Sequence, residues 1–294
     1  MELHAKKDIE NISLEILKGS KSIDVFPTPV DKIMQYAELT LADGGMDLKA
    51  LEKKHKTFVI TEALRSGWSK VRGFLDRSEK IIYVDLNQNE SRQSFVKLHE
   101  TGHSVLPWQK KILQFLDDDD TLDPDIDAEF EAEANYFASI TLFQNDRFLK
   151  EVQKHELGIP AAMVVSKHFG ASIHATLRRY VEKSNKRCAL LVLKNMSKKG
   201  ELVNADFRNA FHSDKFLQDF GGVQWPEKFG YKWDFVKPCH FGIRHKLNGE
   251  ISLNTESGTQ NFNYHLFNNT FNAFILFFPQ GENKKTNTKI ILQG

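Results

Sequence analysis

Two histidines and one glutamate, His99, Glu100 and His103, are the residues whose type and spacing could carry out chemistry. Apolar residues around them recur at helical spacing, and helix positions four apart lie one above the other. The two imidazoles can therefore point at one ion, which is typical of zinc ligands. Glu100 is rotated away from that ion and can accept a proton from a water molecule beside it. The pattern predicts the zinc centre of a peptidase; the alternative is a surface helix with two ordinary histidines.

A catalytic zinc site of this kind needs a third protein ligand, and the helical segment Asp127–Leu142 supplies the candidates. Glu131 lies on a stripe of small apolar residues, where a carboxylate is costly unless it is paired or bound to metal. We therefore expect Glu131 to be the third ligand and Glu129 and Glu133 to form a solvated acidic face, although Glu133 stays open as an alternative ligand. Asn135, one turn after Glu131, is placed to accept the second N–H of a ligating histidine.

Further motifs precede and follow the two histidines. In chain order they are Arg72–Arg77 (RGFLDR), Ile82–Asp85 (IYVD), Arg92–Phe95 (RQSF), His99–His103 (HETGH) and Glu131–Ala138 (EAEANYFA). Together, over roughly residues 30 to 145, they resemble the ImmA/IrrE family of bacterial zinc metallopeptidases. The resemblance implies a zincin-like domain with His99, His103 and Glu131 as ligands of one Zn2+ ion, for which Mn2+ is a substitute, and Glu100 as general base.

The resemblance also implies a substrate and a domain plan. The substrate would be a helix-turn-helix transcriptional repressor whose cleavage releases stress genes of the DNA-damage response or phage-defence genes, and single-stranded DNA is a candidate activator. Longer family members carry a helix-turn-helix and a GAF-like domain after the peptidase. We expect a zinc metallopeptidase domain at residues 1–147, a helix-turn-helix at 148–187 and a GAF-like sensor at 188–294. The fold class is α+β, with a mostly helical peptidase domain and a small sheet.

Other elements must position the motif helix. Two strands at Val71–Leu75 and Ile81–Leu86, joined by the polar turn Asp76–Glu79, predict a hairpin. In related peptidases an edge strand near the metal binds the substrate as an added strand, so one of these two strands is the candidate. A helix is expected from Val30, and a second short helix at Asp47–Lys56.

An aspartate-rich segment, Leu116–Asp127, separates the two helices of the predicted metal site. It lacks the glycine and glutamate of an EF-hand loop, so a solvated loop at the mouth of the site is favoured over a calcium site. Its charge could attract the basic surface of a DNA-binding repressor.

A pair of helices around the turn Phe169–Ser172 predicts a helix-turn-helix. Its net basic face could contact the phosphates of nucleic acid. The residues that we expect to make these contacts are Lys167, Arg178, Arg179 and Lys183. The alternative is that the pair packs on the peptidase domain.

Residues after Arg187 predict a sheet domain. Strands are expected at Cys188–Leu193, Phe235–Arg244, Ile251–Leu253 and Phe262–Phe278, and a helix at Asn204–Phe216. The aromatic residues of this domain either line a ligand pocket or form plain core. They are Trp225, Tyr231, Trp233 and Phe235.

Composition describes an ordinary globular protein, with 40% apolar and 27% charged residues and a net charge of +1. Overall charge therefore implies no partner, and any affinity for nucleic acid must come from a local patch. The charged start does not resemble a signal peptide, and the longest apolar run, Ala273–Phe278, is too short to cross a membrane. Cys188 and Cys239 fit a reducing compartment, so we expect a cytoplasmic protein.

Two functions of different classes follow. The first is a zinc-dependent endopeptidase that cleaves a partner repressor. The second is a DNA-binding regulator with a non-catalytic or structural metal site, which would need a fourth protein ligand at a suitable spacing.

Overall fold

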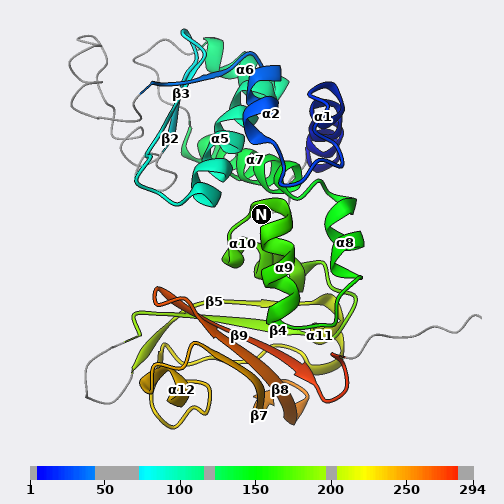
Figure 1. Cartoon of the computed structure of the whole chain (residues 1–294), viewed down its shortest axis with the longest axis vertical. Helices are drawn as coiled ribbons and strands as arrows, with labels where there is room; N and C mark the ends of the chain where they lie inside the picture. Colours follow the sequence, from blue (N-terminus) through cyan, green and yellow to red (C-terminus); the bar gives the residue numbers. More distant parts are fainter. Residues whose placement is uncertain (1–4, 44–72, 116–122, 197–203, 284–294) are drawn as a thin grey trace, which may run out of the picture. The chain divides into compact units, whose positions relative to one another are not determined.

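The computed structural model describes residues 5–43, 73–115, 123–196 and 204–283. The chain divides into two compact units. The N-terminal unit consists of Met1–Phe148 and Lys167–Ser172, and the C-terminal unit of Leu149–Ser166 and Ile173–Gly294. Each unit combines helices with a sheet, which confirms the predicted α+β class (Figure 1).

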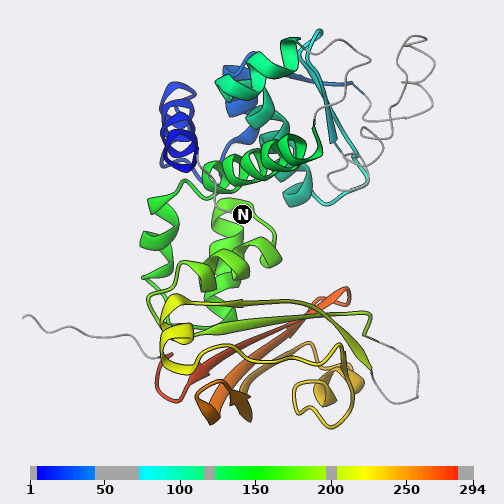
Figure 2. The same cartoon turned by 180° about the vertical axis from the view of Figure 1, so that it is seen from behind.

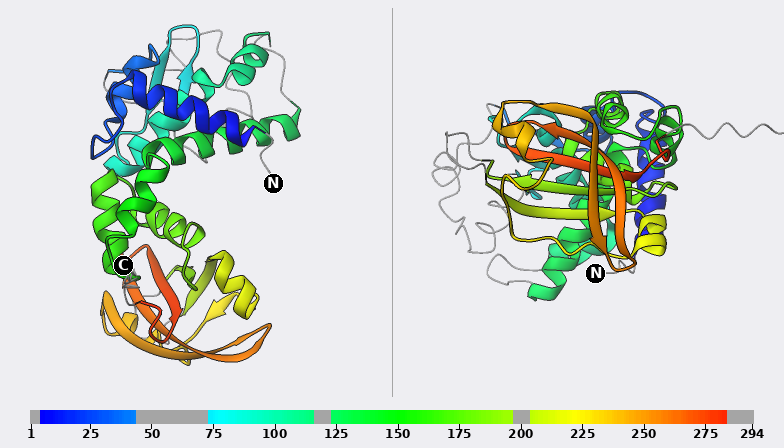
Figure 3. Two further views of the ribbon diagram at one scale, coloured as in Figure 1. Left: turned by 90° about the vertical axis from the view of Figure 1, so that its right-hand side faces the viewer. Right: turned by 90° about the horizontal axis from the view of Figure 1, so that it is seen from below.

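Helices form most of the N-terminal unit. They are α1 (Lys6–Gly19), α2 (Val30–Tyr36), α5 (Glu90–Val105), α6 (Pro107–Phe115) and α7 (Pro124–Leu142), followed by α8 (Asp146–Val152) across the boundary. The side chain of Asn89 caps α5 by accepting a hydrogen bond from the amide of Arg92. The helix ends before Leu106, which is extended because Pro107 disfavours helical geometry in the residue before it. Helix α7 packs against both α5 and α1, and Figure 3 (left) shows α1 lying along it.

A three-stranded sheet lies beside α5 in this unit. Its strands are β1 (Thr40–Leu41), β2 (Gly73–Asp76) and β3 (Ile81–Val84), in the order β1-β3-β2. Strands β2 and β3 are antiparallel, with Gly73 opposite Val84, so the predicted hairpin is confirmed. The helix expected at Asp47–Lys56 and residues 116–122 of the aspartate-rich segment lie outside the described residues.

The C-terminal unit contains a six-stranded antiparallel sheet of order β6-β5-β4-β9-β8-β7. Its strands are β4 (Ala189–Lys194), β5 (Ala205–His212), β6 (Lys228–Phe229), β7 (His245–Thr255), β8 (Gly258–Asn268) and β9 (Asn272–Pro279). The helix predicted at Asn204–Phe216 is wrong, because this segment forms β5 and only then turns into α11 (Asp214–Phe220), as Figure 2 shows from behind. The strand predicted at Phe235–Arg244 is also wrong, because it contains the short helix α12 (Lys237–His240).

Alternate residues of the strands face the core of the C-terminal unit. Leu191, Tyr264 and Phe277 pack there with Phe235 and with partly buried Trp225 and Trp233. These aromatic residues therefore belong to plain core, whereas Tyr231 is 38% exposed.

Helices α9 (Ile159–Phe169) and α10 (Ile173–Glu182) form where the helix-turn-helix is predicted, with Gly170 between them at a positive φ of 71°. Helix α10 packs on β4 and β5. Within the described part of the chain, no helix has the length and apolar character needed to cross a membrane.

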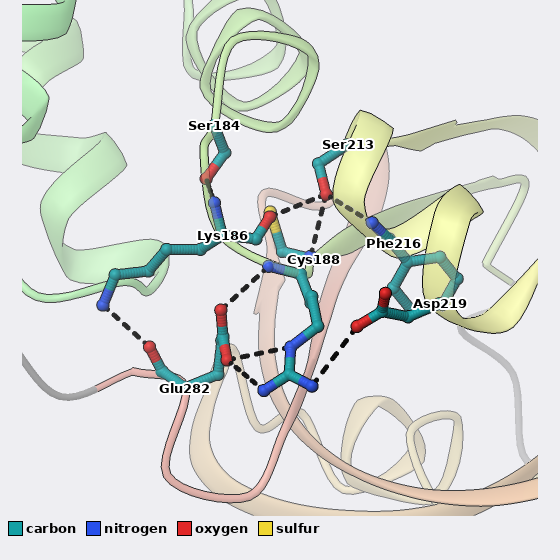
Figure 4. A network of polar contacts seen from close by, with 8 residues as sticks. Ser184, Lys186, Cys188, Ser213, Phe216, Asp219 and Glu282 are labelled. Carbon is teal, nitrogen blue, oxygen red and sulfur yellow. Dashed lines mark hydrogen bonds and ion pairs between the residues drawn. The ribbon is translucent and has the colours of Figure 1, made fainter.

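A polar network joins three segments of the C-terminal unit (Figure 4). The carboxylate of Glu282, just after β9, accepts hydrogen bonds from Arg187 Nη2 at 2.8 Å, from its Nε at 3.1 Å and from its backbone N at 3.0 Å. Lys186 Nζ donates to the carbonyl of Glu282 at 2.8 Å. Ser213, the N-cap of α11, donates from its hydroxyl to the carbonyl of Lys186 at 2.7 Å and accepts from the backbone N of Cys188. The network therefore holds the chain entering β4 against α11 and the end of β9.

Candidate metal centre

Three side chains from two helices converge in the N-terminal unit. The Nε2 atoms of His99 and His103, on consecutive turns of α5, lie 3.1 Å apart. The carboxylate of Glu131, on α7, lies 3.4 Å from His99 Nε2 and 3.2 Å from His103 Nε2. Two atoms bound to one tetrahedral zinc ion at about 2.0–2.1 Å would be about 3.3 Å apart. The two imidazole nitrogens and the two carboxylate oxygens therefore lie at about the spacing that a metal ion requires, and the three residues form a cluster that could hold one among the described residues.

The close packing of α5 on α7 brings these groups together. Gly102 lies between the two histidines in sequence, and a Cβ atom there would be 3.3 Å from Ala134 Cα and 3.1 Å from the ring of Phe137. Glycine at this position and the small residues on α7 thus allow the two helix backbones to approach closely. These small residues belong to the apolar stripe from which the sequence predicts Glu131 as the third ligand.

The proton-accepting candidate, Glu100, is 6% exposed and lies beside the hairpin. A Cβ atom on Gly73 of β2 would be 3.3 Å from Glu100 Oε1, so the strand passes close to the carboxyl group. Burial raises the pKa of Glu100, against the opposing effect of His99 and His103. A raised pKa is the property that a general base for this chemistry needs, since such groups work best near the ambient pH.

Glu131 and His103 change each other's pKa. Burial acts to raise the pKa of Glu131, but hydrogen bonds from His103 and His99 hold it well below its usual range. Burial acts to lower the pKa of His103, yet the hydrogen bond to Glu131 and the charge of Glu100 raise it overall. Arg77, in the turn after β2, is a cation whose charge acts on both Glu100 and Glu131, and sequence reasoning gave it no role.

The prediction that Asn135 contacts a ligating histidine is wrong. Asn135 is exposed, and the partner of His103 Nδ1 is Gln109 Oε1, at 2.8 Å. Helix α7 meets α5 at Ala134 and Phe137, and Asn135 is rotated by about 100° from Ala134, which carries it off that face. The Nδ1 atom of His99 is buried and has no hydrogen-bond partner among the described residues.

The prediction that Glu133 is solvated is also wrong. This residue is 3% exposed and accepts hydrogen bonds from Trp108 Nε1 at 2.7 Å and from Gln109 Nε2 at 2.6 Å. The physical reason is that α6, directly after α5, covers a second face of α7. A spacing of six residues from His103 to Gln109 carries no recognisable signal by itself, because it crosses from one helix into the next.

The four cations expected to contact nucleic acid are not all exposed. Arg179 is only 7% exposed, which corrects its assignment to the basic surface. Arg178 is exposed but pairs with Glu182 at 2.8 Å and lies over the ring of Phe211. Lys183 is exposed in the C-terminal unit, and Lys167 is exposed in the N-terminal unit.

Similarity to known proteins was found both in the sequence and in the fold. Residues 52–180 match the sequence profile of the IrrE N-terminal-like domain, a peptidase family. A solved structure of a Mycobacterium tuberculosis transcriptional regulator is similar in fold, with a TM-score of 0.50 and 12% sequence identity over 93% of this chain and 76% of that chain. At this identity the likeness shows the fold alone. No match was found among curated proteins.

Proposed function

Because residues 52–180 carry an IrrE N-terminal-like peptidase domain, we propose that this protein is a zinc-dependent endopeptidase. His99, His103 and Glu131 are the proposed zinc ligands, and Glu100 is the proposed general base. The observation that carries the proposal is the convergence of three donor atoms from two helices next to a buried carboxyl group. The donor set, two imidazoles and one carboxylate, is the one found in many catalytic zinc sites, and Mn2+ is a plausible replacement for the ion.

In this mechanism the chain's own residues handle the protons. A zinc ion held by the three ligands would supply Lewis acidity toward the peptide carbonyl and the attacking water. The carboxylate of Glu100 accepts a proton from that water and later donates it to the amide nitrogen of the leaving peptide. Burial of Glu100 keeps bulk water away from the carboxyl group during this transfer.

We place the substrate peptide along β2. Strand β3 pairs with β1 on one side and with β2 on the other, whereas β2 pairs only with β3 among the described residues. An extended peptide could therefore add to β2 through main-chain hydrogen bonds. Gly73 supports this choice, because a side chain there would collide with Val96 and approach the carboxyl group of Glu100.

The proposed substrate is a helix-turn-helix transcriptional repressor, with single-stranded DNA as a candidate activator. The family resemblance motivates the substrate, and the fold likeness to a transcriptional regulator supports a regulatory setting. We further propose the domain plan of a peptidase at residues 1–147, a helix-turn-helix at 148–187 and a GAF-like sensor at 188–294, in a cytoplasmic protein. Helices α9 and α10 and the antiparallel sheet with its helices are compatible with the last two parts.

The test compares cleavage of the repressor by zinc-loaded wild-type protein and by the Glu100→Gln variant. We expect the variant to keep its zinc but to cleave about 100- to 10,000-fold more slowly, the usual contribution of a general base. Glu129→Gln, on α7 and partly exposed, is the matched control and should cleave normally. Cleavage at the wild-type rate by Glu100→Gln would rule out the catalytic assignment.

The second candidate function is a DNA-binding regulator whose metal site is not catalytic. The likeness in fold to a transcriptional regulator and the exposed Lys183 favour it, while the burial of Arg179 and the packing of α10 on the sheet count against it. DNA binding that Lys183→Ala weakens, combined with no cleavage by wild-type protein, would favour this second function.

A further inference from the structure

A row of buried polar side chains leads from His103 away from the three donor atoms. His103 Nδ1 contacts Gln109 Oε1, Gln109 Nε2 contacts Glu133 Oε2, and Trp108 Nε1 contacts the same oxygen of Glu133. Gln109 is fully buried, and Glu133 is 3% exposed. We infer that Gln109 and Glu133, with Trp108, are positioning residues that hold His103 as a metal ligand; this rests on the proposed function of the same site.

The orientation of the Gln109 amide follows from its neighbours. Its Nε2 lies 3.1 Å from the carbonyl oxygen of Phe130 and 2.6 Å from Glu133 Oε2. A backbone carbonyl can only accept, so the amide must present its N–H groups to this side. The oxygen of the amide consequently faces His103.

That oxygen in turn selects the tautomer of His103. An amide oxygen can only accept, so at 2.8 Å the Nδ1 atom must carry the hydrogen. When the ring is neutral, as it must be to bind a metal, its lone pair is then on Nε2, which faces His99 Nε2 and Glu131. This is the form in which an imidazole binds a metal, and a hydrogen bond to its other nitrogen fixes the ring orientation. The opposite tautomer would place an N–H where the ion must bind.

Glu133 fixes the other end of the network. It lies two residues after Glu131 on α7, while Trp108 and Gln109 lie in the first turn of α6. A carboxylate as buried as this one is costly unless its acceptor positions are filled, and both donors fill the same oxygen. These hydrogen bonds therefore hold α6 against α7 beside Glu131, so that one network positions two of the three expected ligands. The Nδ1 atom of His99 has no comparable partner among the described residues.

The first test measures zinc affinity in the full-length protein by competition with a chromophoric chelator, which does not depend on peptidase activity. We expect Gln109→Leu to bind zinc about 10- to 100-fold more weakly than wild type, the usual effect of losing an outer contact to a ligand. Asn135→Ala, at an exposed position of α7, is the matched control and should stay within about threefold of wild type. An unchanged affinity in Gln109→Leu, or an equal loss in Asn135→Ala, would overturn the inference.

A pair of variants at Glu133 provides an independent test. Trp108 Nε1 and Gln109 Nε2 both donate to one oxygen of Glu133, and an amide oxygen can take its place. We therefore expect Glu133→Gln to keep its zinc affinity within about threefold of wild type, and Glu133→Leu, which removes the acceptor, to bind zinc about 10- to 100-fold more weakly. Proton NMR of zinc-loaded protein labelled with nitrogen-15 histidine should show the Nδ1–H signal of His103 in wild type and in Glu133→Gln. If Gln109→Leu fails to fold, an unchanged zinc affinity in Glu133→Leu, or an equal loss in Glu133→Gln, still refutes the inference.

The positioning role of Gln109 and the proposed zinc site can be refuted separately. If wild-type protein binds zinc and cleaves its substrate while Gln109→Leu binds zinc equally well, only the positioning inference falls. If wild-type protein binds no zinc, both the proposed function and the positioning inference are wrong.

Discussion

Replacing Gly102 by alanine tests whether the close approach of α5 and α7 sets the geometry of the metal centre. The added Cβ would lie 3.1 Å from Phe137 Cδ1 and 3.3 Å from Ala134 Cα. Carbon atoms in good contact are about 3.5 Å apart or more, so the deficits are about 0.4 and 0.2 Å. The ring of Phe137 can turn aside, but the backbone at Ala134 can only move with α7. Glu131, three residues earlier on α7, should then shift by a similar distance.

A shift of this size has a large effect on the geometry of a metal site but a small effect on the stability of the fold. Metal–ligand distances are held to within about 0.2 Å, so we expect Gly102→Ala to weaken zinc binding about tenfold. Overpacking costs about 1–3 kcal/mol, while alanine in place of glycine favours the helix by about 1 kcal/mol. The free energy of unfolding of the metal-free protein should therefore fall by only about 0–2 kcal/mol. Loss of affinity without comparable loss of stability is the diagnostic result.

Chelator competition and urea denaturation of the metal-free protein measure the two quantities. Gly230→Ala is the control, because its Cβ would meet Asn204 Oδ1 at an ordinary 3.6 Å. Zinc affinity within about twofold of wild type in Gly102→Ala would show that the helix spacing does not limit metal binding, and the reasoning from Gly102 would be wrong.

Three further predictions concern the C-terminal unit. Burial and nearby arginines lower the pKa of His174 from 6.5 to about 4, so the unfolded chain binds a proton first as the pH falls. The free energy of unfolding should therefore fall between pH 6.5 and about 4, by at most about 3.5 kcal/mol at about 1.4 kcal/mol per pH unit, and urea unfolding of His174→Phe should lack this pH dependence. Glu282→Ala removes the carboxylate that accepts hydrogen bonds from Arg187 and should lower the free energy of unfolding by about 1–2 kcal/mol. Asp219, whose contact with Arg187 is longer and exposed, is the control, and Asp219→Ala should change this free energy by less than about 0.5 kcal/mol. Equal effects of the two variants would contradict the stabilising role of the network. Burial raises the pKa of Cys188 to about 12, so this thiol should not react with a disulfide reagent until the protein unfolds, and rapid labelling would show that it is accessible.

The part of the site that could be predicted from sequence follows from helix periodicity. His99 and His103 are four residues apart on one helix, so their convergence needs no knowledge of the rest of the fold. Glu131 needs one further step, the phase of a carboxylate relative to small residues on a packing face. Both steps use positions within a single helix, and the structure brings all three residues together.

The outer contacts depend on how a third helix packs, and sequence periodicity does not carry that information. Gln109 reaches His103 only because Pro107 ends α5 and α6 starts at once beside α7. A glutamine in the first turn of a short helix has no distinguishing feature in the sequence. The same packing buries Glu133, although a run of acidic residues in the sequence predicts a solvated face.

The sequence of strand β5 predicts a helix because a β-bulge interrupts the alternation of its apolar residues. Leu193 pairs with Phe207 and Val192 with Asn209, so Arg208 is an extra residue in the ladder. The apolar positions on either side of the bulge therefore do not share one period of two, and the spacing imitates a helix. Pairing with β4 decides the outcome, and such pairing is a long-range contact.

The two glutamates of α7 illustrate how position on a helix separates roles that residue type leaves open. Residues two apart on a helix point about 200° from each other, so Glu131 and Glu133 cannot reach the same ion from one rigid helix. One side of α7 faces α5, and Glu131 contacts the imidazoles there; the other faces α6, and Glu133 meets Trp108 and Gln109. If Glu133 were the ligand instead, α7 would have to rotate by about half a turn and bury its exposed Asn135 side. The choice between the carboxylates is thus a choice between two packings of one helix, and the hydrogen bonds of Glu133 stabilise the packing that leaves Glu131 facing the histidines.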